Sequence, residues 1–154
     1  MLVALQNGRS TISQKNFCRP VLSCKHGAAM SGEKKKILLV DDEEVILFGL
    51  RQVLMEPWLQ VDTASTVDEV KALSRENAYS AAIVDMRLSN STAIEGLDLI
   101  PYLKTMQKNC RIIVLTAYGD ETIRQKAFNF GADIFLEKPV DPETLKKNLV
   151  ALGI

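Results

Sequence analysis

Five side chains suited to chemistry stand directly after short apolar runs in this 154-residue chain. Asp41 and Asp42 follow ILLV, Asp85 follows AAIV, Thr116 follows IIVL, and Lys138 stands two residues after IFL. Carboxylate oxygens without His or Cys suit Mg²⁺ or Mn²⁺, which complete their coordination with phosphate oxygens. A carboxylate nucleophile assisted by a metal ion, a lysine and a hydroxyl can perform phosphoryl transfer. The set therefore predicts a phosphoryl site that depends on Mg²⁺ or Mn²⁺.

The apolar runs before these residues are the predicted strands of a parallel sheet. Runs rich in β-branched and aliphatic residues alternate with stretches of helical period, which is typical of an α/β sheet covered by helices. We predict strands at 37–40, 60–64, 81–84, 112–115 and 134–136. Three runs, at 37, 81 and 112, are apolar at every position, so these strands should be central. Functional groups then gather beyond the carboxyl ends of the strands.

Helical periodicity between the strands predicts five helices, at about 45–54, 67–73, 97–107, 120–130 and 141–150. Thr66 should cap the second helix, and Asp141 followed by proline should cap the fifth. Pro101 should clash with the preceding turn of the third helix, which predicts a late start or a kink there. Gly131 should end the fourth helix. The fifth helix should bury Leu145, Leu149 and Val150.

Composition excludes several classes of protein. The chain has 19 basic and 19 acidic residues, which gives no broad basic surface for a nucleic-acid backbone or an anionic membrane. No apolar run approaches the roughly 20 residues of a membrane helix. Cys18, Cys24 and Cys110 make no disulfide pattern, and the first two with His26 make a poor zinc site. We therefore expect a cytoplasmic domain with an ordinary core, and for Cys110 a buried apolar position.

Residues 1–33 differ in composition from the rest of the chain. No Asp or Glu occurs before Met30, and no apolar periodicity persists, so we expect a disordered extension before a domain at 34–154. Met30 is an alternative natural start. A transit peptide is a weaker alternative because the amphipathic period is poor. The lysines at 34–36 are interpreted as a solvated charge run.

Four motifs, ILLVDDEE, AAIVDMRL, IIVLTAYG and GADIFLEKPV, occur in the order and spacing of the receiver domain of two-component response regulators. The chain resembles this family over about residues 35–152, and most resembles stand-alone, chemotaxis-type receivers. The resemblance implies a doubly wound, flavodoxin-like parallel sheet of five strands in the order 2-1-3-4-5, with helices on both faces.

The resemblance also implies roles for the five chemical residues. Asp85 corresponds to the aspartate that accepts the phosphoryl group, and together with Asp41 and Asp42 it would bind Mg²⁺. Lys138 corresponds to the lysine that pairs with the phosphoryl group, and Thr116 to the switch hydroxyl. Together, Asp85, Lys138 and Thr116 would form the catalytic set.

Two further positions follow from the resemblance, and the loop after Asp85 departs from it. The backbone carbonyl of Arg87 would complete the metal shell, and Phe135 would be the aromatic switch residue. Ser89 stands where receivers commonly have proline, and the matching glycine is Gly96, about three residues later than usual. The longer loop affects the position of the Arg87 ligand.

These features predict a phosphorylation switch. A histidine kinase or a histidine phosphotransfer protein would phosphorylate Asp85, and the face between the fourth and fifth helices would then bind a downstream protein. Such a switch catalyses only its own phosphorylation and dephosphorylation. Because the sequence given stops soon after the fifth helix, we expect a receiver without an output domain, one that binds neither nucleic acid nor membrane.

Two alternatives use the same fold class. Phosphatases of the haloacid dehalogenase type also use an aspartyl nucleophile with Mg²⁺, but they carry Asp-x-Asp after the first strand and need a cap domain. A flavodoxin-like cofactor binder needs a phosphate cradle after that strand, and Asp-Asp-Glu-Glu offers none. Both alternatives are therefore disfavoured.

Overall fold

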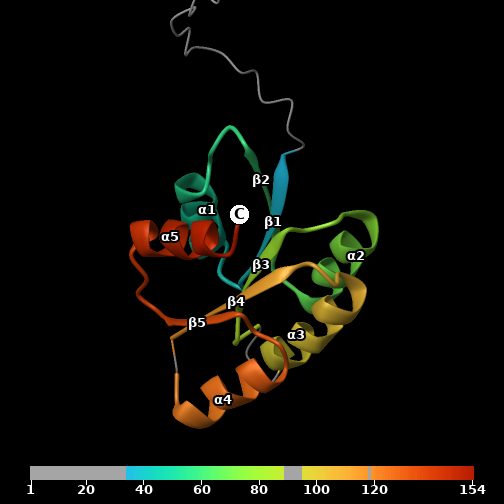
Figure 1. Ribbon diagram of the computed structural model, residues 1–154, viewed down its shortest axis with the longest axis vertical. Coiled ribbons are helices and arrows are strands. Elements are labelled where there is room, and N and C mark those ends of the chain that lie inside the picture. Colours follow the sequence, from blue (N-terminus) through green and yellow to red (C-terminus); the bar gives the residue numbers. More distant parts are fainter. Residues whose placement is uncertain (1–33, 89–94, 118) are drawn as a thin grey trace, which may run out of the picture. The chain divides into compact units, whose positions relative to one another are not determined.

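The computed structural model describes residues 34–88, 95–117 and 119–154 as a single parallel sheet with helices on both faces (Figure 1). The strand order is β2-β1-β3-β4-β5, as predicted. The strands are β1 (Lys35–Val40), β2 (Leu59–Ala64), β3 (Ala81–Asp85), β4 (Arg111–Thr116) and β5 (Ile134–Glu137). The helices are α1 (Glu44–Val53), α2 (Val67–Glu76), α3 (Glu95–Met106), α4 (Glu121–Asn129) and α5 (Pro142–Ala151). The predicted extension at 1–33 lies outside the described residues.

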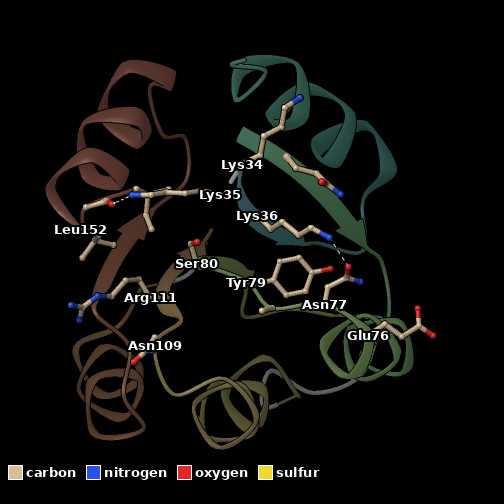
Figure 2. Close-up of a pocket in the computed structure, with 14 residues that line it drawn as sticks. Lys34, Lys35, Lys36, Glu76, Asn77, Tyr79, Ser80, Asn109, Arg111 and Leu152 are labelled. Carbon is tan, nitrogen blue, oxygen red and sulfur yellow. Dashed lines mark hydrogen bonds between the residues drawn. The ribbon is translucent and has the colours of Figure 1, made fainter. Parts of the chain in front are cut away.

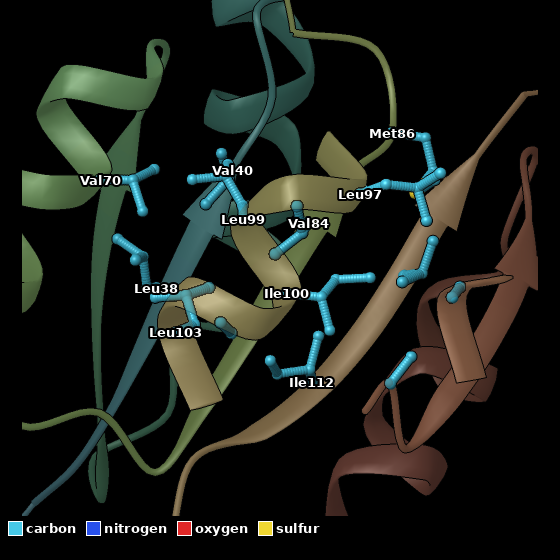
Figure 3. Close-up of a cluster of buried hydrophobic side chains, with 14 of the residues drawn as sticks. Leu38, Val40, Val70, Val84, Met86, Leu97, Leu99, Ile100, Leu103 and Ile112 are labelled. Atoms are coloured by element: carbon cyan, nitrogen blue, oxygen red, sulfur yellow. The ribbon is translucent and has the colours of Figure 1, made fainter. Parts of the chain in front are cut away.

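Successive residues of the central strands face opposite layers of helices, which explains why these strands are apolar at every position. Leu38 and Val40 of β1 pack in the cluster that α2, α3 and α4 cover, part of which Figure 3 shows. Ile37 and Leu39 of the same strand pack in the cluster that α1 and α5 cover. The predicted central strands are confirmed as β1, β3 and β4.

Local capping signals are confirmed at the starts of α2 and α5. The Thr66 hydroxyl accepts a hydrogen bond from the Glu69 amide at 3.2 Å, and the Glu69 carboxylate accepts one from the Ser65 amide at 2.7 Å. The Asp141 carboxylate accepts a hydrogen bond from the Thr144 amide at 3.0 Å. These bonds satisfy amides that have no partner within the helix.

Of the two alternatives expected for α3, the late start is wrong, and the kink at Pro101 stays a prediction. The helix begins at Glu95 and continues through Pro101 to Met106. Proline inside a helix costs about 3 kcal/mol. Leu97, Ile100 and Leu103 are each at most 4% exposed, and their burial offsets that cost.

Val150 of α5 is not a core residue, in contrast to the prediction. Leu145 and Leu149 are buried as expected, but Val150 is 70% exposed because it lies on the opposite side of the helix from the sheet. The prediction for Cys110 is confirmed, since its side chain is buried and burial raises the pKa of the thiol to about 12. Within the described ranges, no helix is both long enough and apolar enough to cross a membrane.

Asp133, just before β5, joins α3 to β4. Its carboxylate accepts hydrogen bonds from the Lys104 ammonium at 2.7 Å, the Ile112 amide at 2.8 Å and the Arg111 guanidinium at 2.9 Å. Burial alone would raise the pKa of Asp133, but these three donors outweigh it and hold the pKa below the ordinary value of 3.8. The charged form therefore stabilises the fold.

Asp133→Asn should lower the free energy of unfolding by about 1–2 kcal/mol at pH 7, because charged hydrogen bonds become neutral ones. The pKa of Asp133 is lower in the folded chain than in the unfolded chain, so the charged carboxylate stabilises the folded state at pH values above the unfolded pKa. This contribution is lost as the pH falls through the folded pKa. The difference in stability should therefore begin to shrink as the pH falls below about 3.9 and should disappear below the folded pKa of Asp133. Denaturant titrations at several pH values measure this, with Asp68→Asn on exposed α2 as the control. A difference that does not depend on pH would contradict the prediction.

Candidate functional site

The strand register places the predicted chemical residues at one edge of the sheet. Asp41 follows β1 directly, Asp85 is the last residue of β3, and Thr116 is the last residue of β4. β3 and β4 pair so that Asp85 lies beside Leu115, the neighbour of Thr116. The backbone amide of Lys138 donates a hydrogen bond to the carbonyl of Thr116 at 2.7 Å, which carries Lys138 from the end of β5 toward the same edge.

The Lys138 ammonium bridges two of the carboxylates. Its Nζ lies 2.6 Å from Asp41 Oδ2 and 2.6 Å from Asp85 Oδ2. Burial disfavours the charged form of Lys138, but the two carboxylates outweigh burial, so its pKa is raised above the ordinary value. Lys138 is therefore a fixed positive charge beside Asp85.

Asp41 is held from both of its carboxylate oxygens. Oδ1 accepts a hydrogen bond from the Glu43 amide at 2.9 Å, and Oδ2 accepts the bond from Lys138. The side chain is almost fully buried, and this burial raises the pKa of Asp41 although both hydrogen bonds act in the opposite direction. A second cation near Asp41 would favour its charged form.

The third carboxylate, Asp42, completes an acidic cluster. One oxygen from each of Asp41, Asp42 and Asp85 lies within 4.8 Å of the other two, with Asp42 exposed and the others buried. Three carboxylates face one ammonium at this edge, so negative charge is in excess. Hard oxygen ligands with excess negative charge fit a divalent cation such as Mg²⁺.

Arg87 and Thr116 also lie where the sequence predicts them. The Arg87 amide donates a hydrogen bond to Asp85 Oδ1 at 3.2 Å, while its side chain is exposed. Thr116 is buried at the end of β4. The role of the Arg87 carbonyl as a metal ligand stays a prediction, and Ser89 lies outside the described residues.

Gly96 packs against the backbone that follows Asp85. A Cβ atom at position 96 would lie 2.5 Å from the Asp85 carbonyl oxygen and 2.6 Å from the Met86 Cα. Both neighbours are main-chain atoms, so no side-chain rotation relieves the clash. This contact gives a physical reason for glycine at the position that the resemblance singled out.

Gly96→Ala should therefore move the chain beside Asp85. We expect a loss of about 1–3 kcal/mol in the free energy of unfolding, as for overpacking, together with slower phosphorylation by acetyl phosphate. Gly49→Ala in α1 is the matched control, because no atom lies within 4 Å of its added Cβ. It should be neutral or slightly stabilising, since alanine favours the helix. Equal behaviour of the two variants would show that the close approach at Gly96 is unimportant.

Phe135 is part of the core and of a small aromatic cluster. It is 7% exposed, and its ring centroid lies 6.5 Å from that of Phe128 on α4. The Arg124 guanidinium lies 5.9 Å from both ring centroids. Arg124 was not among the predicted residues, although its spacing of four residues from Phe128 on a helix indicates the pair.

Comparison with known proteins identifies the class. The family model of the response regulator receiver domain matches residues 37–150. The chain is 34% identical over 122 residues to the photosynthetic apparatus regulatory protein RegA of Cereibacter sphaeroides, and 33% identical over 117 residues to the transcriptional regulatory protein SrrA of Staphylococcus aureus. These alignments cover 79% and 76% of this chain. They cover 65% of RegA and 47% of SrrA, so the chain spans less than two thirds of these relatives.

Solved structures agree with this result. A response regulator from Burkholderia pseudomallei, crystallised with a phosphorylated aspartic acid, calcium ion and citrate, matches at 34% identity and a TM-score of 0.69, covering 77% of this chain and 66% of that one. A CheY-like receiver domain protein from Methanospirillum hungatei matches at 29% identity and a TM-score of 0.71, covering 79% and 95%. The chain therefore belongs to the response regulator receiver domain family.

Proposed function

We propose that this protein is a phosphorylation switch in which Asp85 accepts a phosphoryl group from a phosphohistidine of a histidine kinase or a phosphotransfer protein. The observation that carries the proposal is the cluster of Asp41, Asp42 and Asp85, two of which, Asp41 and Asp85, contact the Lys138 ammonium. Membership of the receiver family supports it. The Burkholderia relative, with its phosphorylated aspartic acid and calcium ion, also supports it.

Each residue of the proposed site has a separate role in phosphoryl transfer. An Asp85 carboxylate oxygen forms the bond to phosphorus while the bond to the donor's leaving group breaks. Lys138 and Thr116 stabilise the negative charge on the transferring phosphoryl oxygens. Asp41, Asp42 and Asp85, with the Arg87 carbonyl, would hold Mg²⁺ or Mn²⁺, which supplies further charge neutralisation when bound. Charge stabilisation accounts for most of the catalysis expected here.

The binding of a downstream protein is proposed for the surface formed by α4, β5 and α5. Phosphorylation would reposition Thr116 and Phe135 and change the face formed by α4, β5 and α5, where a downstream protein would bind. Phe135 supports this step because it lies in β5, which directly precedes Lys138, and contacts Phe128 and Arg124 of α4. A cytoplasmic location stays a prediction.

The test is phosphorylation of the full chain by acetyl phosphate. We expect Mg²⁺-dependent incorporation of one phosphate per chain that is acid-stable and base-labile, and no incorporation in EDTA. Beryllofluoride with Mg²⁺ should give a stable mimic of the same state. Rapid turnover of a phosphomonoester would instead favour the phosphatase alternative, and flavin absorbance in the purified protein would favour the cofactor binder.

A further inference from the structure

A polar cavity of about 810 Å³ opens at the amino ends of the strands (Figure 2). Its walls include the residues that begin β1 and those that precede or begin β3 and β4, together with the chain that follows α5. The carboxylate cluster lies at the opposite, carboxyl ends of the same strands. Since β1 rises about 3.3 Å per residue over its length, the two places are roughly 17 Å apart. The cavity is therefore separate from the proposed phosphorylation site.

Positive charge predominates in the walls of this cavity. Its charged side chains are four basic ones and one acidic one, Lys34, Lys35, Lys36, Arg111 and Glu76. Arg111 forms an ion pair with Asp133, a carboxylate that it shares with Lys104. Among residues 34–88, 95–117 and 119–154, none of the three lysines forms an ion pair. Their charges are thus available to an anion.

Lys35 and Lys36 also contact different parts of the fold. Lys35 and Lys36 are successive strand residues, so their side chains leave on opposite faces of the sheet. Lys35 Nζ donates to the Gly153 carbonyl beyond α5, and Lys36 Nζ donates to Asn77 Oδ1 beyond α2 at 2.7 Å. Figure 2 shows both side chains directed toward these walls. Each ammonium has three donors and uses one on a neutral acceptor, which leaves donors for a ligand.

We propose that this cavity binds a small molecule that carries two or more linked phosphate groups. Lysine recognises phosphate as a point charge. The volume lies in the range of small-ligand sites. Two ammonium groups that leave one strand on opposite sides match the two ends of a phosphate chain better than they match a single phosphate. The Ser80 hydroxyl and the Asn109 amide line the same cavity and offer neutral donors.

Calorimetric titration of the full chain with inorganic tripolyphosphate tests the proposal. Divalent cations are omitted, so that the carboxylate cluster repels the probe. We expect saturable binding, and the double variant Lys35→Gln/Lys36→Gln should weaken it by about tenfold or more, because two charged hydrogen bonds are lost. The matched control Lys126→Gln/Lys147→Gln removes two exposed charges elsewhere and should change the Kd by less than about twofold. Absence of saturable binding at millimolar tripolyphosphate, or an equal loss in the control, overturns the proposal.

Two further probes distinguish specific binding of linked phosphates from general attraction of anions to the lysines. Tighter binding of tripolyphosphate than of orthophosphate supports a site that spans the strand. Equal affinity for the two would overturn it, because a site that spans the strand should gain contacts from each linked phosphate. Binding of a single-stranded oligonucleotide without binding of tripolyphosphate would also overturn it, in favour of a nucleic-acid surface.

Discussion

The Asp85→Asn variant should incorporate no base-labile phosphate from acetyl phosphate in the presence of Mg²⁺. The amide keeps the shape of the side chain, but it lacks the carboxylate nucleophile and the charge beside Lys138. Because the nucleophile itself is removed, the expected effect is complete loss rather than slower transfer. Phosphate incorporation is measured by radiolabelling and by intact mass.

Asp68→Asn is the control for this experiment. Asp68 is an exposed carboxylate on α2, and its replacement changes the net charge by the same amount. It should be phosphorylated at the wild-type rate. Labelling of Asp85→Asn at the wild-type level would falsify the assignment of Asp85 as the acceptor.

The Lys138→Met variant should lose about 2–4 kcal/mol of unfolding free energy in EDTA, because two carboxylates in a buried cluster lose their shared cation. Asp41 and Asp85 are both buried and both lie 2.6 Å from the Lys138 ammonium. Adding Mg²⁺ should recover part of the loss, since a bound cation restores positive charge beside them. Phosphorylation should still be slower by about 100-fold, because the fixed charge beside the phosphoryl group is missing.

Lys146→Met provides the comparison for stability. Lys146 forms an ion pair with Glu56 at 2.7 Å, but its side chain is 42% exposed. Its loss should therefore cost less than about 1 kcal/mol, with no dependence on Mg²⁺. If both variants lost the same stability, the buried bridge at Lys138 would not be the stabilising feature that its geometry indicates.

Features that depend on neighbouring residues could be predicted from the sequence. The caps at Thr66 and Asp141 and the glycine that follows α4 are set by hydrogen bonds and backbone angles within a few residues. The strands pair with distant segments, but their short apolar runs of β-branched and aliphatic residues are visible locally in the sequence. The chemical residues could be found because parallel strands all carry their carboxyl ends to one edge. Asp41, Asp85, Thr116 and Lys138 therefore lie near one another as soon as the sheet order is known.

Features that depend on packing between distant segments were decided by the tertiary structure. The cost of Pro101 in α3 is outweighed by burial against the sheet, and Val150 is exposed because α5 turns it away from the core. Hydrophobic periodicity in the sequence indicates neither whether burial outweighs the cost of Pro101 nor whether Val150 faces the core. The sharing of Lys138 between Asp41 and Asp85 also requires three strand ends to meet, and Arg124 contacts Phe135 only because α4 packs on β5.

The lysines at 34–36 show most clearly the difference between what neighbouring residues determine and what packing between distant segments determines. In the sequence they form a charge run, and a charge run is ordinarily solvated. In the fold, Lys35 and Lys36 become opposite walls of a cavity, because strand geometry directs neighbouring side chains to opposite faces and the ends of α5 and α2 supply their partners. Residue types and local spacing therefore determined the sheet and the edge that carries the carboxylates. Long-range packing decided which charges meet, because only the folded chain brings residues such as Lys138 and Asp41 into contact.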